Sequence, residues 1–203
     1  MGGRFISFEG GEGGGKSTQL RRLAERLSAR GLDVVTTREP GGTPGAEDIR
    51  RLLVEGEPGR WDGRVEALLV NAARADHVAR LIRPALDAGT WVLCDRYVHS
   101  TLAYQGAARG LEDAELRRLH AFATGDLWPD LTIVLDVDPA LGLARAAARA
   151  GGEARFEGEP PAFHKAVRDR FLSFPDVTVI AGSAPLDDVT DAIWARVSAR
   201  FGL

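Results

Sequence analysis

The segment at residues 10–17 has the residue types and the spacing that hold a chain of phosphates. It reads Gly-x-x-x-x-Gly-Lys-Ser, follows a short apolar run and precedes an amphipathic helical pattern, which is the setting this motif requires. The glycines let successive backbone N–H groups curl round phosphate oxygens, and the helix N-terminus adds partial positive charge. Lys16 then reaches the β- and γ-phosphates, and Ser17 is placed to ligate Mg²⁺. The residues expected to cradle a nucleotide are Gly10, Gly11, Glu12, Gly13, Gly14, Gly15, Lys16, Ser17 and Thr18.

Lysine is rare in this chain, which makes the lysine of the loop informative. The sequence has 26 lysine and arginine residues together, and only Lys16 and Lys165 are lysines. A compact ammonium group fits inside a phosphate cradle, whereas the planar fork of an arginine does not. The lysine at position 16 therefore favours a phosphate-binding loop over a flexible glycine turn.

Two acidic residues near the ends of apolar strand patterns compete for the role of magnesium ligand. Asp95 comes directly after one apolar run, and Asp136 lies near the end of another. A carboxylate directly after a buried parallel strand is where nucleotide-binding folds hold Mg²⁺, usually through water. Asp138 and Pro139 have the pattern of a helix N-cap followed by proline, so the loop after Asp136 is expected to start a helix. We therefore assign the metal site to Asp95 together with Ser17.

Strand and helix patterns alternate along the chain and bring these residues to one edge of a sheet. Parallel strands need helical crossovers, which cover both faces of the sheet. Loops after the carboxyl ends of the strands carry the ligands, so Arg38, after the second strand, is aimed at the same rim as the phosphate loop. We expect a single α/β domain over residues 1–203, a three-layer α/β/α sandwich with a five-stranded parallel sheet. The expected strands lie at 5–8, 32–37, 90–94, 131–137 and 177–181. The helices to which the pattern assigns both ends lie at 46–54, 64–82, 139–150, 162–174 and 186–201.

Composition and charge indicate an ordinary globular domain and argue against several classes of partner. The 203 residues are 44% hydrophobic and 27% charged, and the formal net charge of −3 argues against nonspecific binding to nucleic acid. We find no signal-peptide pattern and no apolar stretch approaching ~18 residues, so we expect no membrane partner and a cytoplasmic location. Cys94, the single cysteine, excludes an internal disulfide, and the four histidines lack metal-ligand spacing.

Several polar residues leave two interpretations open. Asn71, Arg74 and Asp76 interrupt the apolar face of the long helix pattern, so they either line a cleft or lie on its solvated side. The segment at 102–110 mixes aromatic, polar and glycine residues, which is typical of small-molecule sites. Glycines on both sides of a polar stretch at 151–161 indicate either a mobile flap or an ordinary connector.

Taken together, the loops resemble the bacterial type of the thymidylate kinase (dTMP kinase) family, which has a fold of the P-loop NTPase type. The matching pieces run over most of the chain in family order. A phosphate loop alone is generic, but REPGGT together with DRY...S...AYQG is rather specific to this family. The matching segments are FEGGEGGGKST at 8–18, REPGGT at 38–43, AAR at 72–74, DRYVHSTLAYQG at 95–106, LDVDPALGLAR at 135–145 and ARFE at 154–157.

The resemblance implies transfer of the γ-phosphoryl group of ATP to dTMP, giving dTDP and ADP, with Mg²⁺. It implies that Arg38 and Arg96 hold the dTMP phosphate, because two highly charged phosphates approach each other only with cationic donors between them. It also implies that Arg74 hydrogen-bonds the thymine edge, which favours the cleft interpretation, and that Tyr104 crowds the 2′ position. Further residues expected at the nucleoside are Tyr97, Ser100 and Gln105.

A lid at about residues 145–160 and a homodimer are also implied. In the bacterial type a lid arginine, here Arg155, supplies positive charge to the transferring phosphoryl group, and an arginine finger can contribute ~10³ or more in rate. Arg145 and Arg149 lie at the root of the lid near ATP, and Glu12 helps to order the lid arginine. The implied dimer could use the long helix from Arg64, although an apolar helix can equally be internal. The catalytic residues implied are Lys16, Arg96, Arg155 and Glu12.

Three positions depart from the family pattern. Val70 stands where a phenylalanine usually stacks on thymine, Ala154 replaces an aspartate before the lid arginine, and Phe171 stands where tyrosine is common. Loss of an aromatic stack costs ~1 kcal/mol or more, so the departures concern affinity for the base and leave the phosphate chemistry untouched.

Two other functions are compatible with a phosphate loop. A kinase for another nucleotide would share the loop, and one acting on a deoxynucleoside would need a carboxylate general base, for which Glu39 is available. A guanine-specific switch protein would want an N-K-x-D loop, and this sequence has none.

Overall fold

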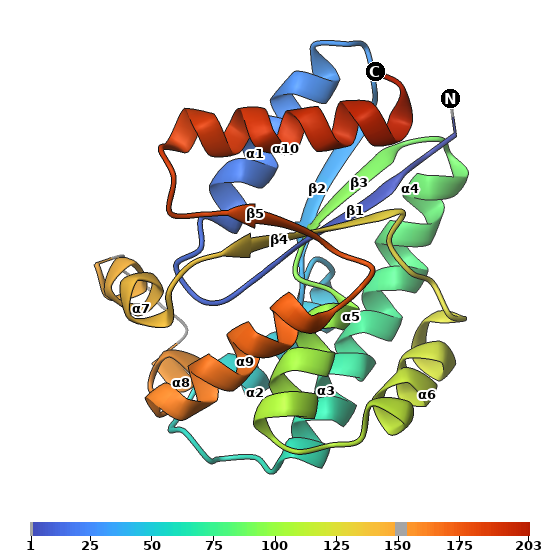
Figure 1. Ribbon diagram of the computed structural model, residues 1–203. Helices are drawn as coiled ribbons and strands as arrows, with labels where there is room; N and C mark the ends of the chain where they lie inside the picture. Colours follow the sequence, from blue (N-terminus) through green and yellow to red (C-terminus); the bar gives the residue numbers. More distant parts are fainter. Residues whose placement is uncertain (1, 149–153) are drawn as a thin grey trace.

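Five parallel strands form a single sheet in the order β2-β3-β1-β4-β5 in the computed structural model, which describes residues 2–148 and 154–203. The chain moves outward from β1 to β2, returns to β3, and then crosses β1 to reach β4, so the first strand lies at the centre (Figure 1). This confirms the expected parallel sheet, with strand bounds that differ by one or two residues at most ends. The strands are β1 (Phe5–Glu9), β2 (Val34–Arg38), β3 (Trp91–Asp95), β4 (Leu131–Asp136) and β5 (Thr178–Ala181).

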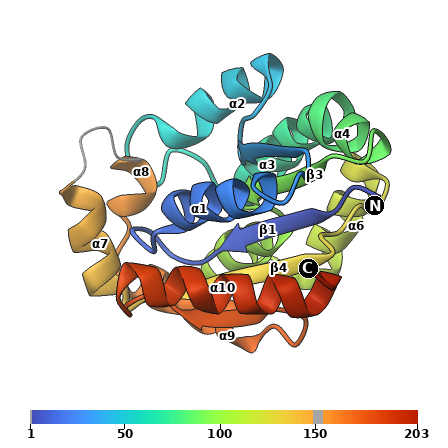
Figure 2. The ribbon, with the colours of Figure 1, turned by 90° about the horizontal axis from the view of Figure 1, so that it is seen from above.

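Helices cover both faces of this sheet. Helices α1 (Lys16–Ser28) and α10 (Leu186–Phe201) lie together on one face, which Figure 2 shows from above. The other face carries most of the remaining helices (Figure 1). These and the peripheral elements are α2 (Pro44–Val54), α3 (Gly63–His77), η1 (Val78–Ile82), α4 (Arg83–Asp87), α5 (Val98–Thr101), η2 (Leu102–Ala108), α6 (Asp113–Thr124), α7 (Pro139–Ala147), α8 (Ala154–Glu157) and α9 (Pro161–Ser173).

The alternation of side chains along β1 explains why the sheet is buried on both sides. Ile6 and Phe8 point to the cluster formed with α1 and α10, whereas Phe5 belongs to the cluster on the opposite face. All three side chains are at most 1% exposed. A strand that buries both faces reads as a continuous apolar run, which is why β1 and β3 were recognisable in the sequence.

The helix expected at 64–82 is longer and less regular than its pattern indicates. It begins at Gly63, with the Asp62 side chain accepting hydrogen bonds from two backbone N–H groups, and continues through η1 and α4 to Asp87. Pro84 explains the wide π-turn of η1, because proline in a regular helix would clash with the carbonyl four residues earlier. The apolar pattern predicted the helix, but it could not predict this change of pitch.

The segment after α7 is only partly described. The expected flap at 151–161 contains α8 and the turn into α9, and residues 149–153 lie outside the described residues. Within the described residues, α7 ends at Ala147, three residues before the bound expected from the sequence. The described part of the chain has no helix both long and apolar enough to span a membrane.

Candidate functional site

The phosphate loop joins β1 to α1, and two of its glycines have no room for a side chain. Gly10 has φ +128°, and a Cβ there would lie 2.5 Å from the carbonyl oxygen of Leu135. A Cβ on Gly13 would lie 1.9 Å from the carbonyl oxygen of Gly142 in α7. Glycine therefore lets the loop pack directly against β4 and α7.

Lys16 begins α1, and its ammonium group lies inside the loop. Nζ donates hydrogen bonds to the carbonyl oxygens of Gly11 at 2.8 Å and Gly10 at 3.2 Å. Burial and then the charge of Arg96 lower the pKa of Lys16. Carbonyl oxygens carry no full negative charge, so a phosphate would be a stronger partner for this buried cation.

Ser17 and Asp95 lie together at the edge of the loop. The Ser17 hydroxyl donates to Oδ2 of Asp95 at 2.6 Å, because β3 pairs with β1 and brings Asp95 beside the start of α1. Hydroxyl and carboxylate oxygens suit Mg²⁺, which binds few protein groups and takes further ligands from phosphate and water. Among the residues that the structure describes, no group of three or more His, Cys, Asp or Glu could hold a metal alone. The pair thus fits an ion that a nucleotide phosphate helps to bind.

The alternative acid, Asp136, has a different partner. Arg168 of α9 donates to its two carboxylate oxygens, from Nε at 2.7 Å and from Nη2 at 3.0 Å. Asp138 accepts hydrogen bonds from the backbone N–H groups of Ala140 and Leu141, as its N-cap pattern predicted. Asp136 therefore ties β4 to α9, and its carboxylate is already neutralised by an arginine.

Arg96 follows β3 and connects the phosphate loop to its surroundings. Its φ of +71° is unusual for a residue other than glycine. Nη1 donates to the carbonyl oxygen of Gly10 at 2.9 Å, and Nη2 donates to Oε1 of Glu12 at 2.7 Å. The hydroxyl of Tyr104 donates to the same oxygen of Glu12 at 2.8 Å. Burial raises the pKa of Glu12, but the charges of Arg96 and Lys16 outweigh burial and lower it to about 2. Glu12 is therefore a carboxylate that orients Arg96.

Glu9, at the end of β1, is a site residue that the sequence patterns did not single out. Its carboxyl group is fully buried, and it accepts hydrogen bonds from the backbone N–H of Tyr97 at 2.8 Å and the Ser100 hydroxyl at 2.5 Å. Burial raises its pKa to about 7, against the lowering effects of Ser100 and Arg96. An acidic residue inside an apolar strand pattern was the available signal. Glu9 therefore holds the backbone at Tyr97 and the side chain of Ser100 in the segment that follows β3.

A pocket of about 50 Å³ opens beside the loop. Its apolar side comes from α2, α3 and α8, through Leu53, Val54, Val70 and Phe156. Its polar side gathers all but one of the residues assigned to the acceptor nucleotide, and Arg38 is the exception. The gathered residues are Arg74, Arg96, Tyr97, Ser100, Tyr104 and Gln105.

Arg74 lies in this pocket within a buried network. Nε donates to Oε2 of Glu39 at 2.7 Å, and Nη2 donates to the Thr101 hydroxyl at 3.0 Å. The other oxygen of Glu39 lies 3.0 Å from Nδ1 of His77, whose Nε2 lies 2.7 Å from the Thr37 hydroxyl. Arg74 is 1% exposed, so the solvated-side interpretation is wrong for this residue. The network holds its guanidinium in one orientation at the pocket wall.

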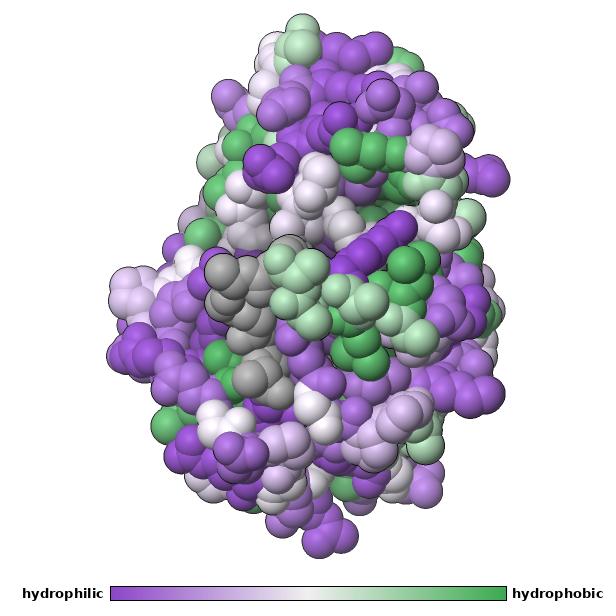
Figure 3. Space-filling model, turned by 90° about the vertical axis from the view of Figure 1, so that its left-hand side faces the viewer, coloured by the Kyte–Doolittle hydropathy of each residue, from purple (hydrophilic) through white to green (hydrophobic). Residues whose placement is uncertain are grey.

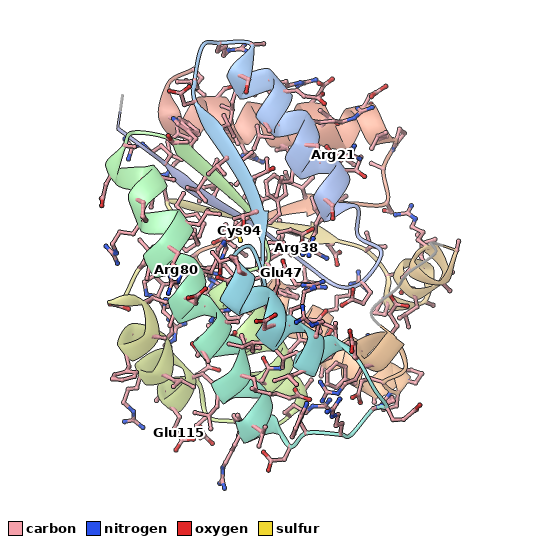
Figure 4. The ribbon with its side chains drawn as sticks, turned by 180° about the vertical axis from the view of Figure 1, so that it is seen from behind. Arg21, Arg38, Glu47, Arg80, Cys94 and Glu115 are labelled. Carbon is pink, nitrogen blue, oxygen red and sulfur yellow. The ribbon has the colours of Figure 1, made fainter. Side chains whose placement is uncertain are left out.

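Arg38 lies near Ser17 and Asp95, the proposed metal ligands, rather than in the pocket. Nη2 donates to both carboxylate oxygens of Glu47, at 3.0 and 3.1 Å, and Figure 4 shows the two side chains together beyond the carboxyl end of β2. A second groove, of about 360 Å³, is lined by Arg38 and Glu47 together with Ser17 and Asp95. Arg38 thus shares a groove with the proposed metal ligands.

The three candidates from the lid segment have different positions. Arg155 of α8 is fully buried and donates to the carbonyl oxygen of Leu53 at 2.8 Å and to Glu66. Nη1 of Arg145 donates to the carbonyl oxygen of Gly182 at 3.3 Å, beside the loop that follows β5. Arg149 lies outside the described residues. Figure 3 shows the face of the molecule on which α7 and α8 lie.

Glu66 is a second residue that sequence reasoning missed. It is fully buried in α3 and accepts hydrogen bonds from Gln105 Nε2 at 2.9 Å, from Arg109 Nη2 at 3.0 Å and from Arg155. Arg109 also pairs with Glu159 at 2.5 Å. An acidic residue among apolar neighbours at the start of a long helix was the signal, but its partners lie about forty and ninety residues away in sequence.

Sequence and structure comparisons agree over nearly the whole chain. A family model described as thymidylate kinase matches residues 8–193. The chain is 50% identical over 206 residues to a thymidylate kinase of Magnetococcus marinus, covering 99% of this chain and 98% of the relative. It is 52% identical over 206 residues to that of Caulobacter vibrioides, covering 99% of each. A crystal structure of thymidylate kinase from Ehrlichia chaffeensis matches with a TM-score of 0.79 at 32% identity, over 97% of this chain and 100% of that chain.

The raised pKa of Glu9 predicts a specific pH dependence of stability. Between its unfolded pKa of 4.5 and its folded pKa of about 7, the folded chain keeps a proton that the unfolded chain has lost. The free energy of unfolding therefore falls as pH rises through this window, by about 3 kcal/mol from this group, and the contribution is constant above it. Urea unfolding from pH 4.5 to 8 should show this fall relative to Glu9→Gln, which cannot titrate. A difference between the two proteins that does not vary with pH would contradict the assignment.

Proposed function

The chain belongs to the thymidylate kinase family, and we propose that the phosphate loop and the adjacent pocket hold its two nucleotides side by side. The enzyme transfers the γ-phosphoryl group of ATP to dTMP, which gives dTDP and ADP and supplies dTTP for DNA synthesis. The observation that carries our assignment is Arg96, which bonds the loop at Gly10 and also lines the pocket. One guanidinium thus reaches both phosphate sites.

The donor side consists of the loop and Lys16, and the acceptor side consists of the pocket. Lys16 would exchange its hydrogen bonds to loop carbonyls for the β- and γ-phosphates of ATP. Arg96 and Arg38 would hold the phosphate of dTMP, and Arg74 would donate to the thymine edge. Catalysis then depends on positioning and on neutralising charge, which are the main requirements of phosphoryl transfer.

The chemistry of Glu39 argues against a nucleoside as acceptor. A hydroxyl acceptor would need a general base, but both oxygens of Glu39 are held by Arg74 and His77. Burial raises the pKa of Glu39, yet the charge of Arg74 and the hydrogen bond to His77 outweigh burial and lower it. A monophosphate acceptor needs no such base, because its phosphate is already ionised at neutral pH.

We assign Mg²⁺ to Ser17 and Asp95 and the transition-state charge to Arg155. A bound Mg²⁺ would neutralise phosphate charge beside Lys16. The oxygen of Ser17 would ligate the ion through a lone pair while its proton stays donated to Asp95. Arg155 of α8, in the lid at about 145–160, is bonded to Glu66 and Leu53, so its role at the phosphates requires its side chain to leave these two partners. Arg145 would approach the ATP base.

A panel of acceptors tests the function directly. We expect ADP formation from ATP to be fastest with dTMP, and about ten- to a hundredfold lower in kcat/KM with dUMP, because a methyl group contributes ~1–3 kcal/mol. UMP, dCMP, AMP, GMP and thymidine should be poor acceptors. Lys16→Ala should lower kcat by about a hundredfold or more with every acceptor. Preference for thymidine, or for another monophosphate, would overturn the acceptor assignment.

The metal assignment is tested by two matched carboxylate variants. Asp95→Asn should raise the Mg²⁺ concentration for half-maximal activity about tenfold or more, because it removes a charge at the ion. Asp136→Asn removes a carboxylate at the end of β4, two strands away from β3, where Arg168 holds it, and should leave that concentration unchanged. An equal shift in both variants would count against Asp95.

We further propose a cytoplasmic homodimer. For the dimer, the support is that α3 and α6 pack against each other and each exposes a large apolar side chain, Leu68 at 59% and Phe122 at 89%. For the location, the support is the reaction's use of ATP to make a DNA precursor. In gel filtration of a cytosolic extract, dTMP kinase activity should elute at about twice the chain mass of 21.8 kDa. Elution at the single-chain mass would exclude the dimer, and activity confined to the membrane pellet would exclude the location.

A further inference from the structure

Helix α8 forms one side of the pocket that we assign to dTMP. Phe156 of α8 lines the pocket together with Val70, Arg74 and Gln105, and its side chain is 8% exposed. It lies eighty-two residues beyond Arg74 in the sequence, so the pocket is complete only when α8 is docked. We propose, on the basis of the function proposed above, that Phe156 is the aromatic wall for the base and a determinant of dTMP affinity.

The other two aromatic rings of the pocket are already engaged by groups with different tasks. Tyr97 is fully buried, its hydroxyl donates to the carbonyl oxygen of Leu127, and the guanidinium of Arg74 lies 4.9 Å from its ring centre. Tyr104 donates to Glu12, and the guanidinium of Arg96 lies 5.0 Å from its ring centre. Both tyrosines thus support the arginines that would bind polar parts of the nucleotide.

The guanidinium of Arg155 also lies near Phe156, 5.0 Å from its ring centre, but Phe156 differs from the tyrosines because it has no hydroxyl and presents only apolar surface. Its ring packs edge to face against Tyr104, with centroids 5.7 Å apart and planes at 86°. Leu53, Val54 and Val70 extend the same apolar side of the pocket but contribute no ring. A planar base gains from an aromatic face and a 5-methyl group gains from apolar surface, and this side offers both through Phe156.

The docking of α8 is fixed by ion pairs next to the pocket. Arg155, adjacent to Phe156, donates to Leu53 and to Glu66, which also accepts a hydrogen bond from the pocket residue Gln105. Arg155 and Glu66 are both fully buried. A buried charge is stable only when it is paired, so this pairing orients α8 and Gln105 together. The apolar wall and a polar group facing the base therefore depend on one carboxylate.

The test compares the effect of a variant on dTMP affinity with its effects on ATP binding and on kcat. Phe156→Ala should raise the Kd and the KM for dTMP about tenfold, the usual result of removing one ring from a stacked base. The KM for ATP and the kcat at saturating dTMP should stay within about twofold. Phe156→Leu, which keeps apolar volume without a ring, should lie between wild type and Phe156→Ala. Thermal unfolding of each variant checks that it folds.

Two matched controls separate the base from the phosphate. Deoxyribose 5-phosphate lacks the base, so its inhibition constant should be the same for wild type and Phe156→Ala. Val70→Phe added to Phe156→Ala returns a ring to the same pocket and should recover most of the lost affinity for dTMP. An unchanged KM for dTMP, or a fall in kcat with a raised KM for ATP, would overturn the inference while wild-type activity upholds the function. If wild type itself fails to phosphorylate dTMP, the proposed function fails instead.

Discussion

Burial of arginines against carboxylates is the interaction on which this site depends. Arg96 pairs with Glu12, Arg74 with Glu39, and Arg155 with Glu66, and in each pair both side chains are largely or fully removed from water. Removing one partner of such a pair leaves a buried charge and typically costs about 3–5 kcal/mol. Each carboxylate therefore does two things, since it makes burial of the cation possible and fixes the direction of its remaining N–H groups.

This arrangement suits an enzyme that must bring two anionic nucleotides together. Long arginine side chains lose considerable entropy when they are held by a ligand, and pairs formed in advance remove most of that loss. Arg74 shows the principle, because Glu39, Thr101 and Asn71 engage it before any base is present. Phosphates would find the cations already oriented, which is how preorganised charge stabilises a transition state in phosphoryl transfer.

The sequence predicted what depends on local pattern and missed what depends on distant pairing. The phosphate loop, the strand before it and Asp95 were recognisable because strand runs and glycine spacing are local signals. Glu9 and Glu66 were not recognisable, because each is an isolated acidic residue in an apolar segment. Their partners lie up to ninety-one residues away in sequence. Resemblance to a family supplied Arg74, for which the helix pattern alone favoured a solvated position. No sequence pattern indicated that Phe156 lies against the pocket, because α8 has only four residues.

The position of Arg155 is compatible with a role at the phosphates because Glu66 has other hydrogen-bond donors. Glu66 keeps its hydrogen bonds to Gln105 and Arg109 when Arg155 leaves, so the buried carboxylate is not left without partners. Within the described part of the chain, Nε of Arg155 has no hydrogen-bond partner, and such an unsatisfied buried donor costs about 1–3 kcal/mol. The docked state of α8 therefore gives Arg155 fewer bonds than its five N–H donors can make. A phosphate group offers the missing acceptors, so exchange of Glu66 for phosphate would couple occupancy of the donor site to release of the Arg155 side chain, while Phe156 stays at the pocket.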